Sequence, residues 1–316
     1  NRILLATSGS PGTLKDINSQ GGGIYETTDG GESWTQKIRN DINVYSTRLG
    51  LAFKPGNTQT YYYGTSAAPA SYNEADQTKI FVTKGIIYQT TDNGQTWTEL
   101  ETGFIKNARL MSIMVHPSKP DTITAATAVI NRNIEGPNDI AAQQMGIIQT
   151  TDGGKTWKRV DNLPVGYEGS QETKAAPSNG DNMFHIPMIQ GDDNLPKAFY
   201  SLDGGKTWLE LAKHMDSVSY DPHDLSGKRL LGYSWQCMGE CQKTLWQSLD
   251  AGKSWQSFGT LPSEIKNIMD QKTRVQNIVW HPTNKSTFFM TGAGGLVWKT
   301  TDNGSSWNKL LDYGQL

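Results

Sequence analysis

An eight-residue element recurs six times along this chain of 316 residues. Each copy contains Thr or Ser, any residue, Asp, a small residue, Gly, any residue, Ser or Thr, and finally Trp. The copies are Thr27–Trp34, Thr90–Trp97, Thr150–Trp157, Ser201–Trp208, Ser248–Trp255 and Thr300–Trp307. Their aspartates lie 47 to 63 residues apart, a period typical of folds in which stacked repeats share a core. The repeat therefore constrains the fold more than any other feature.

Each copy predicts the turn of a β-hairpin. Alternating apolar runs such as Gly23–Glu26 and Leu296–Lys299 precede it, as expected of strands. The Asp carboxylate can accept hydrogen bonds from turn N–H groups, and the Gly can adopt positive φ. The Trp begins the returning strand and offers a large ring for packing. We therefore predict a structural role for the six aspartates Asp29, Asp92, Asp152, Asp203, Asp250 and Asp302.

A second turn, which contains proline, alternates with the first. Its copies begin at Lys54, His116, Ala176, Asp221 and His281. Each repeat then reads strand A, proline turn, strand B, loop, strand C, Asp turn and strand D. In the leanest repeat the expected strands are 274–280, 286–291, 296–301 and 306–310.

This order predicts an all-β protein, a β-propeller of six four-stranded antiparallel blades, with seven as the alternative. The Asp turns lie in the C–D hairpins. We expect a single domain over residues 1–316, with blades at about 1–40, 41–100, 101–161, 162–212, 213–260 and 261–316.

The eight-residue element resembles the Asp box, or bacterial neuraminidase repeat. That repeat occurs in sialidases, sortilin-type receptors, xyloglucanases and many bacterial extracytoplasmic propellers. The resemblance covers essentially the whole chain and implies a member of the sialidase-like and sortilin-like superfamily, located outside the cytoplasm: extracellular, periplasmic or at the cell surface. It does not select a function, because this fold hosts hydrolases, receptors and assembly factors.

Composition argues against a nucleic-acid partner and against a transmembrane segment. The chain has 29 basic and 31 acidic residues and a formal charge of −2, so we expect no nucleic-acid partner. It has no run of 18 apolar residues, so we expect no transmembrane segment. Asn1–Leu5 reads as strand B of the first blade. We therefore expect this polypeptide to be part of a larger chain or complex, or a trimmed form.

Cys237 and Cys241 are the chain's two cysteines. Because the resemblance implies export, we predict a disulfide that closes a small loop. Two unpaired thiols, or half of a metal site, are the alternatives. We expect no cofactor; a structural Ca²⁺ at Asp192–Asn194 is an alternative to a plain turn there.

Antiparallel strand order separates two ends of each blade. The proline and Asp turns share one end, and the B–C and D–A loops share the other. The predicted B–C loops are 9–22, 66–84, 128–145, 190–196, 236–243 and 292–295. Long loops on a rigid scaffold commonly carry recognition, so we predict the binding surface at the loop-rich end.

Arg48, Arg109 and Arg274 fall at matching positions near the starts of their strands A. Sialidases of this superfamily hold a substrate carboxylate with three arginines, and guanidinium groups bind carboxylates bidentately. Separate solvated arginines are the alternative.

Tyr72, Tyr167 and Trp235 lie on or near the loop-rich end and could stack on a sugar or a partner protein. Glu172, near Tyr167, is a candidate for an acidic catalytic or ligand-binding residue. No carboxylate pair stands out as the two that glycoside hydrolysis requires.

We therefore expect a non-catalytic extracytoplasmic propeller that binds a protein or glycan partner, or serves as a scaffold subunit, through its loop-rich end. The alternative is a glycoside hydrolase, sialidase-like or acting on a polysaccharide. A third hypothesis resembles the photosystem assembly factors, which dock through an arginine patch.

Overall fold

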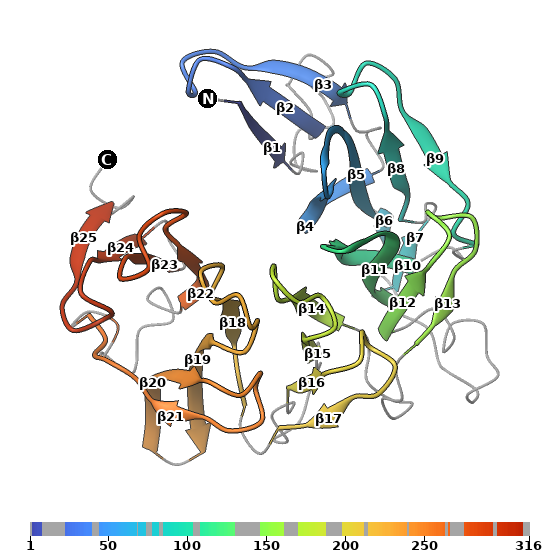
Figure 1. The fold of residues 1–316 in the computed structure, drawn as a ribbon. Coiled ribbons are helices and arrows are strands. Elements are labelled where there is room, and N and C mark those ends of the chain that lie inside the picture. Colours follow the sequence, from blue (N-terminus) through green and yellow to red (C-terminus); the bar gives the residue numbers. More distant parts are fainter. Residues whose placement is uncertain are drawn as a thin grey trace. The chain divides into compact units, whose positions relative to one another are not determined.

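The structure is a computed structural model in which β-strands form nearly all the regular secondary structure (Figure 1). It describes residues 2–7, 23–39, 44–67, 69–73, 78–81, 85–103, 108–129, 146–160, 170–187, 198–211, 214–238, 240–262, 265, 275–292 and 296–311. The chain divides into two compact units, residues 1–173 with 187–190 and residues 174–186 with 191–316.

The first unit contains three blades. Blade 1 is formed by β1 (Ile3–Thr7), β2 (Gly23–Thr27) and β3 (Thr35–Arg39). Blade 2 is formed by β4 (Val44–Lys54), β5 (Asn57–Ala67), β8 (Ile87–Thr90) and β9 (Thr98–Leu100). Blade 3 is formed by β10 (Ala108–His116), β11 (Lys119–Val129), β12 (Gly146–Thr150) and β13 (Lys158–Arg159).

The remaining three blades lie mainly in the second unit. Blade 4 consists of β14 (Ser170–Ala175), β15 (Met183–Pro187), β16 (Phe199–Ser201) and β17 (Leu209–Glu210). Blade 5 consists of β18 (Ser217–Tyr220), β19 (Leu230–Met238), β20 (Glu240–Ser248) and β21 (Gln256–Ser257). Blade 6 consists of β22 (Val275–Trp280), β23 (Phe288–Gly292), β24 (Leu296–Thr300) and β25 (Asn308–Leu311).

The predicted fold class is confirmed: the protein is an all-β propeller of six antiparallel blades. Blades 2 to 6 have four strands each in chain order, and the described part of blade 1 has three. In blade 6 the observed strands match the predicted ones to within two residues at each end. In blades 2 to 6 each Asp box connects the third and fourth strands, as the repeat predicts, and in blade 1 the box connects β2 and β3.

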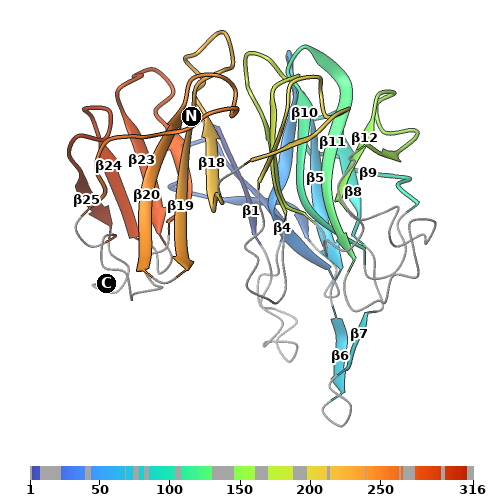
Figure 2. The ribbon, with the colours of Figure 1, turned by 90° about the horizontal axis from the view of Figure 1, so that it is seen from below.

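The predicted 66–84 loop is wrong in part. β5 continues to Ala67, and the segment then forms a separate hairpin of β6 (Pro69–Asn73) and β7 (Thr78–Phe81). Figure 2 shows this hairpin beyond the ends of β5 and β8, in the first unit. Tyr72, Ile80 and Phe81 are residue types common in strands. Pro69 and the mostly polar residues 73–77 favour a loop, so the sequence alone did not indicate this hairpin.

The predicted 236–243 loop is also wrong. Here β19 and β20 stay paired out to Met238 and Glu240, so blade 5 carries an extended ladder where a short loop was expected. Antiparallel pairing can continue as long as backbone groups face one another, and no proline interrupts these residues.

Apolar side chains between neighbouring blades form the cores. In the first unit, Tyr62 and Ile87 of blade 2 pack with Leu110 and Ile123 of blade 3. Gly64 permits this contact, because a Cβ there would lie 1.9 Å from the Leu110 side chain. The close approach of blade 3 thus explains why the strand β5 has a glycine at position 64.

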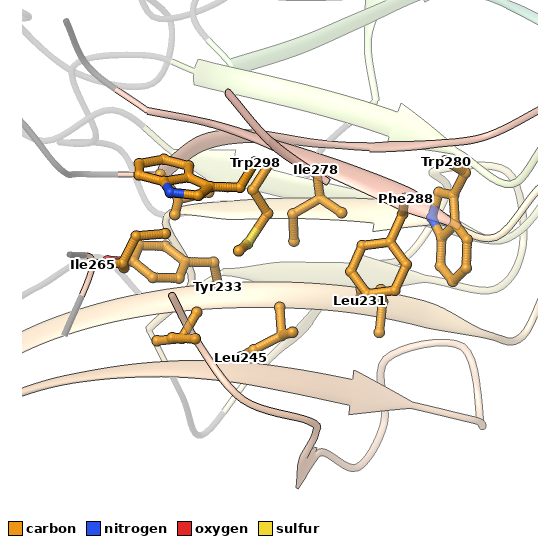
Figure 3. Close-up of a cluster of buried hydrophobic side chains, with 11 residues drawn as sticks. Leu231, Tyr233, Leu245, Ile265, Ile278, Trp280, Phe288 and Trp298 are labelled. Carbon is orange, nitrogen blue, oxygen red and sulfur yellow. The ribbon is translucent and has the colours of Figure 1, made fainter. Parts of the chain in front are cut away.

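In the second unit, blades 5 and 6 share a core that Figure 3 shows. Leu231 and Tyr233 come from β19, and Phe288 and Trp298 from β23 and β24; each is at most 1% exposed. The rings of Phe288 and Trp280 lie 5.3 Å apart, within the range of favourable aromatic contacts. Burial of these large side chains is the main stabilising contribution in this part of the fold.

Candidate functional site

Each Asp box closes its turn with side-chain hydrogen bonds, as the box of blade 3 illustrates. Thr150 Oγ1 donates to Asp152 Oδ1 at 2.6 Å and accepts from the Gly154 N–H at 3.0 Å. Thr156 donates to the same carboxylate through its N–H and its hydroxyl, at 3.0 and 2.6 Å. The Trp157 indole donates to the Gly154 carbonyl at 3.1 Å. In the other five boxes the first hydroxyl donates to the aspartate at 2.5 to 2.8 Å.

The fourth and fifth residues of every box are in the left-handed region. The pairs are Gly30 and Gly31, Asn93 and Gly94, Gly153 and Gly154, Gly204 and Gly205, Ala251 and Gly252, and Asn303 and Gly304, with φ between 57° and 106°. Two successive left-handed residues characterise tight hairpin turns and favour Gly and Asn. At Gly94 there is also no room, since a Cβ would lie 2.3 Å from Tyr61 Oη.

These hydrogen bonds lower the carboxyl pKa values. Bonds from the Thr96 hydroxyl and N–H lower the pKa of Asp92 to about 2, and bonds from Ser306 lower that of Asp302 to about 2. At Asp203 burial raises the pKa, but bonds led by the Thr207 hydroxyl outweigh it and the net shift is downward. A carboxylate bound by its own turn is a poor general acid near neutral pH, so the boxes are turn-stabilising elements.

The boxes lie at the end of each blade opposite the B–C connections, because consecutive strands are antiparallel. The β6–β7 hairpin and the extended β19–β20 ladder are both B–C connections. The loop-rich end of the blades therefore carries the structural variation, and it contains the candidate site.

The first strands of blades 2, 3 and 4 are neighbours at this site. Leu49 of β4 pairs with Ser112 of β10 in a parallel register. Ser112 Oγ in turn accepts a hydrogen bond from the Thr173 N–H of β14, at 3.2 Å. Ser112 and Thr173 are 2% and 4% exposed, so this contact is a buried link between strands.

Three of the predicted site residues lie on these strands. Arg48 precedes Leu49, Arg109 is the second residue of β10, and Glu172 precedes Thr173. The structure therefore places the backbones of these residues on neighbouring strands of the first unit. The Glu172 side chain is largely buried, at 8% exposed, while the side chains of the two arginines lie outside the described residues. Convergence of the arginines stays a prediction.

The other predicted ligand residues are less completely described. Tyr72 pairs with Lys79 in the β6–β7 hairpin, and Trp235 pairs with Lys243 in the β19–β20 ladder, both as backbone positions. Arg274, Tyr167 and Asp192–Asn194 lie outside the described residues. Cys237 and Cys241 are Cα partners across β19 and β20, which is the kind of placement a short disulfide loop needs; the disulfide stays a prediction.

Sequence reasoning overlooked one pair of titratable residues. His214 Nε2 lies 3.3 Å from Asp216 Oδ1, with side-chain exposures of 11% and 4%, directly before β18 in the second unit. The Lys174 ammonium donates to the Val218 carbonyl at 2.8 Å on the same strand. The His-x-Asp spacing at the start of a strand A was the available signal. Within the described residues no group of three His, Cys, Asp or Glu side chains could hold a metal ion.

Comparison with known families gives two matches. The family model Sortilin-Vps10, described as sortilin, neurotensin receptor 3, matches residues 22–183, about half of the chain. The BNR/Asp-box repeat model matches residues 199–208. A curated relative, vacuolar protein sorting/targeting protein 10 of Aspergillus clavatus, is 30% identical over 67 residues. That alignment covers 21% of this chain and 4% of the relative, so the chain corresponds to a small part of it.

Solved structures share the fold at low identity. The GH74 enzyme of Niastella koreensis superposes with a TM-score of 0.62 at 16% identity, over 98% of this chain and 46% of that one. YCF48 bound to D1 peptide gives 0.56 at 14% identity, over 98% and 83%. TolB from Acinetobacter baumannii gives 0.53 at 12% identity, over 97% and 62%. At these identities the likeness concerns the fold alone.

Within the described residues, no helix has the length and hydropathy that crossing a membrane requires.

Proposed function

This chain belongs to the Sortilin-Vps10 family, and from that premise we propose that it is a non-catalytic extracytoplasmic propeller that binds a partner protein through its loop-rich end. The family description names a receptor, and the curated relative is named for protein sorting and targeting. One solved propeller of this fold is named in complex with a peptide. These names support a polypeptide ligand over a glycan.

The β6–β7 hairpin is the observation that carries the proposal. A two-stranded hairpin is at best marginally stable by itself in water, yet this one extends from the scaffold of blade 2 at the end opposite the Asp boxes (Figure 2). The edge of a hairpin can offer backbone N–H and C=O groups to an extended peptide, which is a common mode of peptide recognition. The neighbouring first strands of blades 2 to 4, which carry Arg48, Arg109 and Glu172, form the other part of the proposed site.

A displayed library of random peptides, panned against the purified chain, tests this proposal. The affinity of selected peptides is measured by fluorescence anisotropy against the wild type and a variant in which a Gly-Ser linker replaces residues 69–81. We expect the linker variant to bind at least about tenfold more weakly, a loss of roughly 1.4 kcal/mol.

Leu225→Ser is the matched control, because Leu225 is 85% exposed and lies in the proline turn of blade 5, at the opposite end of its blade. This variant should bind like the wild type. Peptides that bind the linker variant normally would refute the role of the hairpin. Release of reducing sugar from a panel of glycans would instead indicate a glycoside hydrolase, and binding to a glycan array without peptide binding would indicate a lectin.

A further inference from the structure

Four of the proline turns share an internal hydrogen bond. The side-chain oxygen of an Asn or Asp accepts from the backbone N–H two residues later, which defines an Asx turn. The acceptors are Asn57, Asn179, Asp224 and Asn284, at 2.9, 3.2, 3.0 and 3.0 Å. The four turns thus share this hydrogen bond, but they differ in the residue types at the Asx position and two residues later.

Only the turn of blade 6 combines this geometry with an acceptor sequence for N-linked glycosylation. Asn284-Lys285-Ser286 has the pattern Asn-x-Ser or Thr, which marks surface loops of exported proteins. The corresponding turns read Asn57-Thr58-Gln59, Asn179-Gly180-Asp181 and Asp224-Leu225-Ser226. Each of these lacks either the asparagine amide or the hydroxyl residue.

The Asn284 side chain is in a suitable position for modification. Asn284, Lys285 and Thr283 are all exposed. Asn284 Oδ1 accepts the hydrogen bond of the Ser286 N–H. This bond uses the side-chain oxygen and not the amide nitrogen, which is the atom that receives the sugar. The His281 ring stabilises the turn from inside by accepting from the Asn284 N–H at 3.1 Å. A glycan can therefore be attached without disturbing the bonds that hold the turn.

The chain has a second acceptor sequence, Asn303-Gly304-Ser305, inside the Asp box of blade 6. Here Asn303 is left-handed, with φ of 57°, and Gly304 is buried against Phe288. The Ser305 hydroxyl donates to the Asp302 carbonyl at 3.0 Å. The hydroxyl that an acceptor sequence must present is thus already used by the box, so the geometry favours Asn284 over Asn303.

We propose that Asn284 carries an N-linked glycan on the turn end of blade 6. The inference rests on the proposed extracytoplasmic location and is independent of which partner the loop-rich end binds. In the reaction, Asn284 Nδ2 forms a bond to the anomeric carbon of an oligosaccharide carried on a polyprenyl diphosphate. The bond from that carbon to the diphosphate oxygen breaks, the amide proton passes to a base of the transferase, and polyprenyl diphosphate leaves.

Such a glycan has a structural consequence. A bulky, hydrated group on the turn end keeps large partners away from that part of blade 6. Binding is then directed to the opposite, loop-rich end, in agreement with the proposed function.

The test is the intact mass of the whole chain after secretion from a eukaryotic cell, before and after peptide N-glycosidase, which converts a glycosylated asparagine to aspartate. The wild type should carry one glycan. Asn284→Gln and Ser286→Ala should both lose it, and Asn303→Gln should keep it. Ser286→Ala guards against misfolding, because it removes the acceptor sequence but leaves the Asn284 side chain and the turn backbone in place.

Gln59→Ser is the matched positive control, since it creates an acceptor sequence in the equivalent turn of blade 2 and should add a second glycan. A secreted wild type without a glycan overturns the proposal, whether or not Gln59→Ser carries one. A glycan that persists in Asn284→Gln and disappears in Asn303→Gln also overturns it. Peptide binding is measured separately on the wild type and Ser286→Ala. If neither protein binds peptide, the proposed function is refuted and the glycan result is unaffected.

Discussion

The Thr150→Val substitution removes one hydroxyl from the interior of an Asp box and keeps the shape of the side chain. Thr150 is 1% exposed, and its hydroxyl accepts the hydrogen bond of the buried Gly154 N–H at 3.0 Å. Valine leaves this N–H without that acceptor, and a buried donor that loses its partner costs about 1–3 kcal/mol. The lost bond to Asp152 adds less, because water can replace it at an exposed carboxylate.

Two measurements check this reasoning. Urea unfolding followed by tryptophan fluorescence should show a free energy of unfolding lower by about 1–3 kcal/mol for Thr150→Val. Hydrogen exchange of the Gly154 amide should accelerate in the folded state. Thr151→Val is the matched control, since Thr151 is exposed and its substitution should change stability by less than about 0.5 kcal/mol. Equal stability of Thr150→Val and wild type, or equal destabilisation by both variants, would refute a structural role for the hydroxyl.

Three further predictions concern the same scaffold. Hydrogen bonds lower the pKa of Asp92 and Asp302 to about 2, so these carboxylates stabilise the fold fully above about pH 4 and lose that contribution as the pH falls towards 2; unfolding midpoints that stay constant over this range would contradict the prediction. Gly94→Ala should lower the free energy of unfolding by about 1–3 kcal/mol through backbone strain, and the clash with Tyr61 should lower it further. Gly30→Ala should destabilise less, because Gly30 has φ of 85° but no atom lies within 4 Å of the new Cβ. Equal unfolding temperatures of the two variants would exclude the clash. Phe288→Ala should cost about 3–5 kcal/mol because the ring is fully buried, whereas Val279→Ala, at a position 50% exposed, should unfold close to the wild type in the same urea titration.

Local chemistry made much of the fold predictable from the sequence. The Asp boxes use contacts between residues two to four positions apart, so their residue types suffice to predict the turns. Six such turns alternating with proline turns imply the strand order, because each short turn forces the next strand to run antiparallel. Blade 6 shows this most simply, because its strands were predictable to within two residues at each end.

The loop-rich end was less predictable because its structure depends on backbone pairing without a strong side-chain signal. Residues 66–84 and 236–243 show no strong alternation of apolar and polar residues, yet both include paired strands in the structure. The His214–Asp216 pair was overlooked because the His-x-Asp spacing is a weak signal, and only the backbone before β18 brings the two side chains within 3.3 Å.

The sequence by itself therefore determined the repeat, the turns and the class of fold, which arise from interactions between residues close together in the chain. Only the tertiary structure decided which distant strands lie together: β4, β10 and β14 are linked through Leu49, Ser112 and Thr173. It also decided that Gly64 is needed to admit Leu110 from the next blade. Such contacts depend on the packing of whole blades, in which many apolar residues can substitute for one another, so no short pattern in the sequence specifies them.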